Sequence, residues 1–195
     1  MPGNGPALVS KARRANAHSS WLLELAPRVA ELPAPIQKHD DPFLPYCRAV
    51  FAATEGYAAG YVFDLAAFLA LGAAGAVALE RAVAVVAATP ALLAVIHGPF
   101  ARPEYALFAG EAALRADAAT VTDPAVAAAF AVHGVAGLVV TDAPDSTVDS
   151  VNLEAGRARL AGLDFRIARQ SYLNRFQRED FQTALREAAE RGYGA

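Results

Sequence analysis

Short apolar segments alternate with longer segments of helical period along almost the whole chain, and this alternation is the feature that most limits the fold. The apolar segments have the length and composition of buried strands. Strands that alternate with helices predict an α/β fold, with a parallel sheet joined by helical crossovers. The six predicted strands are residues 20–26, 57–65, 91–98, 117–122, 136–142 and 163–169.

The segments between these strands carry apolar residues at helical spacing, with residues that start or stop helices. Pro90 ends one predicted helix, Pro103 stands in the first turn of the next, and Gly192 closes the last. Residues 27–37 are interpreted as a proline-punctuated loop, and residues 1–18 as a flexible or helical extension. The predicted helices are residues 40–56, 72–90, 102–116, 124–134, 151–162 and 178–192.

An open doubly wound sheet and a closed (β/α) barrel both fit this order of elements. A dinucleotide-binding sheet would carry a glycine fingerprint after its first strand, and the sequence there, "ELAPRV", has none. No phosphate-binding loop motif, internal repeat or second domain is visible. We therefore predict a single domain over residues 1–195.

The composition excludes several functional classes. The formal net charge of −3 argues against a nucleic-acid partner. Cys47 is the single cysteine, so a disulfide framework is excluded, and its apolar helical surroundings predict a buried, inert thiol. His18, His39 and His133 show no metal-ligand spacing, no uncharged run has the length of a membrane span, and the N-terminus has no signal-peptide core. We expect a cytoplasmic protein with no cofactor, metal or membrane partner.

Several segments, in collinear order, resemble orotidine 5′-phosphate decarboxylase, a TIM barrel of pyrimidine synthesis. "LLELAPRVAELPAPI" is similar to that family's first strand and the loop after it. "GYVFDLAAFLALGAAGAVALERAV" is similar to its second strand and helix, and "LAGLDFRIARQSY" to its last strand. The resemblance implies a TIM-barrel-like domain, a homodimer, and a site at the carboxyl ends of the strands.

The charged residues of the family's active site are replaced at the matching positions. Ala26 stands where the family has an aspartate, and Val62 where it has a lysine. Val95, His97 and Phe100 stand where the family has an Asp-x-Lys-x-x-Asp array. Neutral groups can neither oppose a substrate carboxylate nor protonate a carbanion, so we expect no orotidylate decarboxylase activity.

The chain is also short for this family between the fifth and the last predicted strands. About one helix fits there, where the family has two further strands and a phosphate- and base-binding loop. We therefore expect a barrel that is shortened or incomplete near the sixth and seventh strands, unless residues 146–152 form one short strand. Arg169 matches the family's phosphate-binding arginine.

The predicted carboxyl ends of the strands supply the candidate site. His97, Asp64 and Glu24 are the candidate catalytic residues, because imidazole and carboxylate groups suit acid–base chemistry near neutral pH. Aliphatic residues in place of charges predict a comparatively apolar pocket for a small molecule. The candidate ligand-binding residues are Ala26, Val62, Phe63, Val95, Phe100, Thr122, Asp142 and Arg169.

Each polar candidate also has a purely structural interpretation. His97 either exchanges protons with a ligand or bonds the loop backbone. Asp64 either works with His97 or caps the helix that starts near residue 66, and we favour the cap. Glu24 is either buried or placed between the barrel and its helices. Residues 122–124, "TDP", are typical of a helix N-cap with proline in the first turn.

Three functional hypotheses follow. The first is a repurposed barrel enzyme that acts on a small metabolite by a lyase, cyclisation or isomerisation step of specialised metabolism. The second is a catalytically dead homologue that binds a pyrimidine nucleotide through Arg169, or a protein partner. The third is a scaffold subunit. An open cavity with His97 facing it would favour the first hypothesis, and a phosphate-binding nest beside Arg169 would favour the second.

Overall fold

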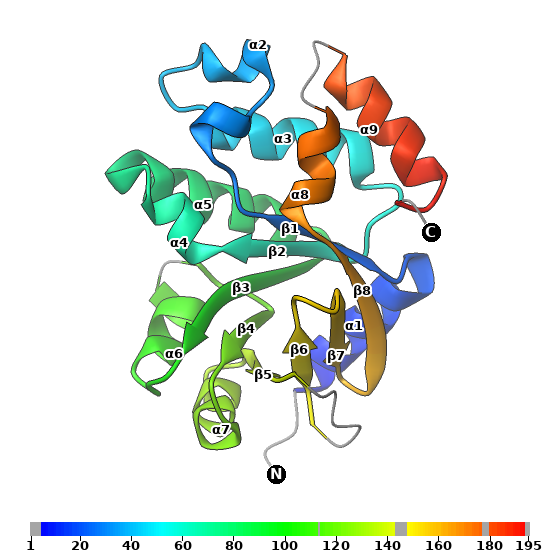
Figure 1. The fold of residues 1–195 in the computed structure, drawn as a ribbon. Helices are drawn as coiled ribbons and strands as arrows, with labels where there is room; N and C mark the ends of the chain where they lie inside the picture. The colour runs from blue at the N-terminus through cyan, green and yellow to red at the C-terminus, as the bar shows by residue number, and fades with distance from the viewer. Residues whose placement is uncertain (1–4, 113, 143–147, 177–179, 194–195) are drawn as a thin grey trace.

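The chain folds into a closed barrel of eight strands, in sequence order around the barrel (Figure 1). The computed structural model describes residues 5–112, 114–142, 148–176 and 180–193. All six predicted strands are present, and two further short ones complete the barrel. The strands are β1 Trp21–Leu25, β2 Gly60–Asp64, β3 Leu93–Phe100, β4 Ala118–Val121, β5 Ala136–Val140, β6 Ser150–Asn152, β7 Arg157–Leu160 and β8 Leu163–Ala168.

The helices lie around the barrel, and most of them match the helical patterns of the sequence. Residues 27–37 contain two short turns of helix in place of an open loop, and residues 102–116 form two short helical pieces in place of one long helix. In the second case Gly110 packs against the backbone of His133, so the chain follows a tight local path there. The helical elements are α1 Pro6–His18, η1 Val29–Glu31, α2 Ala34–Gln37, α3 Phe43–Thr54, α4 Leu65–Leu69, α5 Gly72–Ala87, α6 Tyr105–Leu107, η2 Phe108–Ala112, α7 Pro124–Val132, α8 Gln170–Leu173, η3 Asn174–Phe176 and α9 Phe181–Glu190.

The prediction of a helix over residues 151–162 is wrong, because this segment forms a hairpin. Strand β7 runs antiparallel to both β6 and β8, whereas every other neighbouring pair is parallel. The alternation in "RARL" is the reason: Ala158 and Leu160 face the barrel interior, while Arg157 and Arg159 face away. One hairpin thus takes the place of two strand–helix units. The domain is shortened where the sequence predicts it, and the barrel is nevertheless closed.

Two apolar cores lie on either side of the strands. The inner core fills the barrel and includes Val62, Val95, Leu138 and Phe165. The outer core lies between the strands and the helices, and it contains Phe63 and Phe100 with aromatic residues from α3, α4 and α7. Because successive strand residues alternate between the two cores, the strand register fixes which residues reach the barrel mouth.

Helix α1 covers the amino-end of the barrel, so the predicted N-terminal extension is helical from Pro6. Leu8, Ala12 and Ala15 of this helix join the inner core. Lys11 forms an ion pair of 2.8 Å with Asp117, just before β4. The carboxyl ends of the strands are left for the candidate site. Among the described residues, no helix is long and apolar enough to cross a membrane.

Candidate functional site

The strand register brings four of the predicted polar residues to one side of the barrel wall. Asp64 of β2 and His97 of β3 are direct neighbours across the parallel pair, and Glu24 of β1 lies opposite Val62. Asp64 and His97 each stand two residues after an inner-core valine, and Arg169 stands two residues after the inner-core residue Ile167. All four therefore leave the strands on the interior side, above the apolar core.

A partly buried ion pair joins the neighbouring strands β1 and β8 at the mouth. Glu24 is only 4% exposed, and its Oε2 accepts hydrogen bonds from Nε of Arg169 at 2.6 Å and from the backbone N–H of Gln170 at 3.0 Å. Nη1 of Arg169 donates to the carbonyl oxygen of Leu153 at 2.7 Å. The Arg169 side chain is 42% exposed. Glu24 is therefore buried, as one of its two interpretations predicts. Arg169 is held between β1 and the hairpin.

Gln170 links this pair to the segment after β1. Its Oε1 accepts the N–H of Ala26 at 2.9 Å, and its Nε2 donates to the hydroxyl of Tyr46 at 2.9 Å and to Asn174 Oδ1 at 2.7 Å. Asn174 in turn donates to Glu31 at 2.8 Å. Burial raises the pKa of Tyr46 well above its usual range, so the phenol stays neutral. Sequence reasoning did not identify Gln170, Tyr46 and Asn174 as site residues. Nothing in the local sequence distinguishes a buried glutamine from an exposed one.

Asp64 caps helix α4, as the favoured interpretation predicts. Its Oδ1 accepts the backbone N–H of Ala67 at 2.8 Å. The carboxylate also lines the mouth cavity, so capping does not remove it from the site. The "TDP" prediction is confirmed as well, since Asp123 Oδ1 accepts the N–H groups of Ala125 and Val126 at the start of α7.

His97 is tied to the neighbouring strand through Thr120. Its Nδ1 lies 3.1 Å from Thr120 Oγ1, which also accepts the N–H of Gly98 at 3.0 Å. Burial lowers the pKa of His97 from its ordinary 6.5, and Arg169 lowers it further, while Asp64 and Glu24 act in the opposite direction. The imidazole is therefore neutral at pH 7, a state in which one ring nitrogen accepts a proton and the other donates one.

Replacement of His97 by glutamine should make the stability of the protein less sensitive to acid. Because the pKa of His97 is lower in the folded chain than its ordinary 6.5, the unfolded chain binds more protons as the pH falls through this value. Wild type should therefore lose stability relative to His97→Gln between about pH 7.5 and 5. Urea unfolding at about pH 7.5 and 5 measures the free energy of unfolding of both proteins. A difference between them that does not change with pH would contradict this prediction.

An open cavity of about 860 Å³ lies at the mouth, next to these residues. Alanines in and just after α4, with Leu71 and Val29, form an apolar wall. The polar groups of the lining come from Glu24, Arg28, Glu31, Asp64, Arg169, Gln170, Ser171 and Asn174. Ala26 lines the cavity too. The described lining residues do not include His97, which lies one strand beyond Asp64. The cavity is thus amphipathic, and it lies over β1, β2 and β8.

The other predicted ligand-binding residues lie elsewhere. Val62 and Val95 are in the inner core, below the polar layer, and Phe63 and Phe100 are in the outer core. Thr122 is exposed beside the α7 cap, and Asp142 is exposed, with its carbonyl oxygen accepting a hydrogen bond from Asn152 at 3.0 Å. Cys47 is buried in α3, and burial raises the pKa of its thiol, which suppresses the reactive thiolate. Of the eight predicted ligand-binding residues, the cavity lining contains Ala26 and Arg169.

Comparison with known proteins gives structural matches alone. No family model and no curated protein matches the sequence. Leishmania donovani OMP decarboxylase superposes with a TM-score of 0.55 at 21% identity, over 71% of this chain and 54% of that one. Leishmania donovani UMP synthase gives 0.56 at 20% identity, over 69% of this chain and 30% of that one. Plasmodium berghei orotidine 5′-monophosphate decarboxylase gives 0.53 at 12% identity, over 72% and 61%.

The chain spans about half the length of the solved decarboxylase structures it matches. The hairpin, which replaces two strand–helix units, accounts for part of the missing length. Sequence identities this low establish a shared fold, and function has to be argued from the site. The chain therefore has the barrel fold of the orotidine monophosphate decarboxylases, in a shortened form.

Proposed function

We propose that this chain is a repurposed decarboxylase-like barrel that binds a small metabolite at its mouth and converts it by acid–base chemistry. The reaction class is a lyase, cyclisation or isomerisation step. The observation that carries the proposal is the open mouth cavity, whose wall holds a carboxylate, Asp64, and a positioned guanidinium, Arg169. A core that had only lost its site would be expected to pack shut at this point.

The roles follow from the contacts of each residue. Arg169 is fixed by Glu24 and by the Leu153 carbonyl, and its partly exposed guanidinium can bind a carboxylate or phosphate of the substrate. Asp64 uses Oδ1 for the helix cap, so Oδ2 is the atom we assign as the proton acceptor. His97 is neutral and adjacent to Asp64 in the register but lies outside the cavity lining, so we assign it a positioning role that acts through Asp64.

The apolar wall indicates the rest of the substrate. Ala66, Ala67, Ala70 and Leu71 present small or aliphatic side chains on the α4 side of the cavity. A ligand with an anionic group against Arg169 and an apolar body against α4 fits both walls. Orotidine monophosphate does not fit this proposal as a substrate, because Val62, Val95 and Phe100 supply no ammonium or carboxylate to its decarboxylation.

Ligand binding tests the proposal first. Thermal denaturation is measured with a panel of cyclic and aromatic carboxylic acids, with UMP and with orotidine monophosphate. We expect at least one carboxylic acid to raise Tm in wild type and in Ala73→Trp, but not in Ala70→Trp. Ala70 lines the cavity, whereas Ala73 is an exposed residue of α5 outside its lining, so the pair separates blocking of the cavity from the cost of a surface tryptophan.

Conversion of that ligand tests the chemistry. Asp64→Asn keeps an N-cap residue and removes the carboxylate, so it should retain the Tm shift and lose turnover by about 100-fold or more, followed by mass spectrometry. Binding of UMP without conversion of any panel compound would favour a dead nucleotide-binding homologue. If no panel compound produces a Tm shift that Ala70→Trp abolishes, the result would favour a scaffold subunit.

The resemblance also implies a homodimer, which we retain as part of the proposal. The eight strands of a single chain close the barrel, so a second chain is not needed for closure. Sedimentation equilibrium measures the oligomeric state directly.

A further inference from the structure

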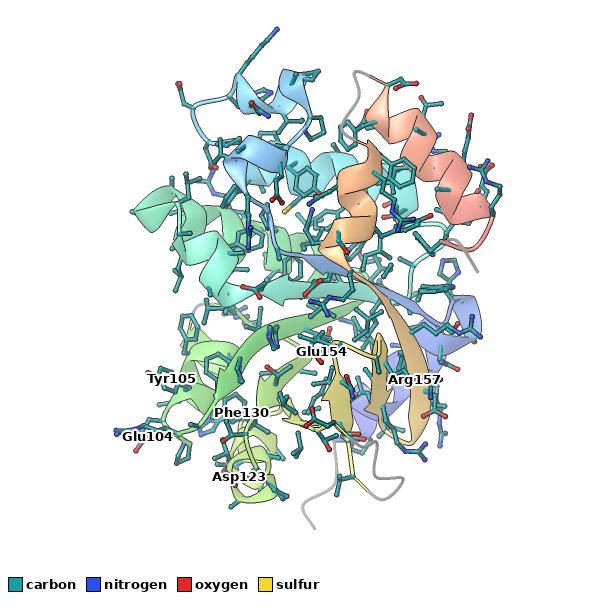
Figure 2. All side chains as sticks on the ribbon, viewed as in Figure 1. Glu104, Tyr105, Asp123, Phe130, Glu154 and Arg157 are labelled. Carbon is teal, nitrogen blue, oxygen red and sulfur yellow. The ribbon has the colours of Figure 1, made fainter. Side chains whose placement is uncertain are left out.

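The outer face of the hairpin carries a cluster of arginines that the mouth site does not use. The residues facing away from the inner core form two rows across the strands. In one row Arg157 of β7 is directly opposite Arg166 of β8, and in the other Ser150, Arg159 and Asp164 are paired across β6, β7 and β8. Figure 2 shows Arg157 beside β8. We call this surface the hairpin arginine face.

The charges on this face are unbalanced. Arg159 pairs with Asp164 at 2.9 Å, which neutralises the second row. In the first row two arginines occupy directly opposite positions across an antiparallel pair, and like charges at such positions destabilise a sheet. A bound anion within reach of both arginines would offset this repulsion.

No helix of the described residues covers this face, because the hairpin lacks crossover helices. Turns at residues 153–156 and 161–162 make the connections from β6 to β7 and from β7 to β8, and both connections are fully described. A hollow of about 520 Å³ lies on this face, and its lining includes the three arginines, Ser20, Thr141, Ser150 and Asp164, the ion-pair partner of Arg159. This volume is typical of small-molecule sites.

Two contacts hold the face in place before any ligand arrives. The guanidinium of Arg166 lies 5.6 Å from the centre of the Trp21 ring, a cation–π contact that limits its movement. Asn152 fixes the turn of the hairpin, since it donates to the Asp142 carbonyl at 3.0 Å and accepts the N–H of Ala155 at 2.8 Å. Side chains that are already positioned lose less entropy on binding.

We propose that the hairpin arginine face is a second binding site, separate from the mouth, for a small phosphorylated anion. Guanidinium groups bind phosphate oxygens through paired hydrogen bonds, and arginines that line one hollow suit a di- or pyrophosphate group. The polar residues Ser20 and Asn152 lie in the same lining and suit the polar remainder of such a ligand. This proposal does not depend on the chemistry at the mouth.

Titration with inorganic pyrophosphate tests the site, using isothermal calorimetry and amide chemical shifts of the whole chain at low salt. We expect saturable binding with a Kd on the order of 1 mM or tighter, with shifts centred on residues 150–152 and 157–166. The double variant Arg157→Gln/Arg166→Gln should weaken binding by about tenfold or more, because both guanidinium groups are lost. The control Arg48→Gln/Arg81→Gln removes the same charge from exposed residues of α3 and α5 and should bind as wild type does.

Stability measurements keep the test decisive if a variant folds poorly. Without pyrophosphate, Arg157→Gln/Arg166→Gln should stay within about 1 kcal/mol of wild type, because relief of the like-charge pair is offset by loss of the Arg166–Trp21 contact. Pyrophosphate should raise Tm of wild type and not of this variant. Equal pyrophosphate affinity in the double variant, or shifts centred on Arg169 at the mouth, would overturn the proposal. So would the absence of saturable binding.

Discussion

Replacement of Gly75 by alanine should lower the free energy of unfolding by about 3 kcal/mol or more. Gly75 lies in the first turns of α5, where the chain packs tightly across the end of α4. A β-carbon at this position would overlap the carbonyl oxygen of Phe68 and press on Leu71. Backbone atoms cannot rotate out of the way as a side chain can, so the two helices must separate.

The matched control is Gly56→Ala, because nothing lies near the position of its added methyl group. We expect this variant to stay within about 0.5 kcal/mol of wild type in urea unfolding. Because α4 forms the apolar wall of the mouth cavity, Gly75→Ala should also weaken ligand binding there. Equal stabilities of the two variants would show that α4 and α5 can move apart at little cost.

Much of the fold can be predicted from sequence, because its longer elements repeat their apolar pattern several times. Strand β3 and helix α5 are examples, each with a continuous pattern bounded by glycine or proline. The hairpin was not predictable in the same way. "RARL" is only four residues long, and over so few residues a period of two and a helical period look alike. The strand and the helix can be told apart only in the folded barrel, where the apolar residues of this segment pack with Leu138, Val151 and Phe165.

The candidate site, too, can be predicted from the sequence only in part. That Asp64, His97 and Arg169 reach the same mouth follows from their positions at strand ends, which the sequence contains. The alternation around Glu24 leaves both faces of the strand open, and the structure places it at the mouth. The side on which Phe63 points also follows from alternation, since it adjoins Val62 and must face the opposite core. The contacts of Gln170 cannot be derived this way. They join residues more than a hundred positions apart in the chain, and pairings at that distance leave no local pattern.

Replacement of Arg169 by methionine should lower the free energy of unfolding by about 2–4 kcal/mol. The variant keeps the length of the side chain but leaves the carboxylate of Glu24 buried without its charged partner. The expected loss is below that of a fully enclosed pair, because the Arg169 side chain is 42% exposed. The Gln170 N–H still bonds Glu24, so the remaining cost comes from the unpaired charge.

A double-mutant cycle separates this charge effect from loss of packing. In Glu24→Gln/Arg169→Met, an uncharged amide oxygen can still accept the Gln170 N–H, and no buried charge remains. We therefore expect the double variant to be more stable than Arg169→Met alone and to lie within about 1 kcal/mol of wild type. If Arg169→Met and the double variant unfold at the same urea concentration, the Glu24–Arg169 contact contributes through packing, and the electrostatic role assigned to it at the mouth is wrong.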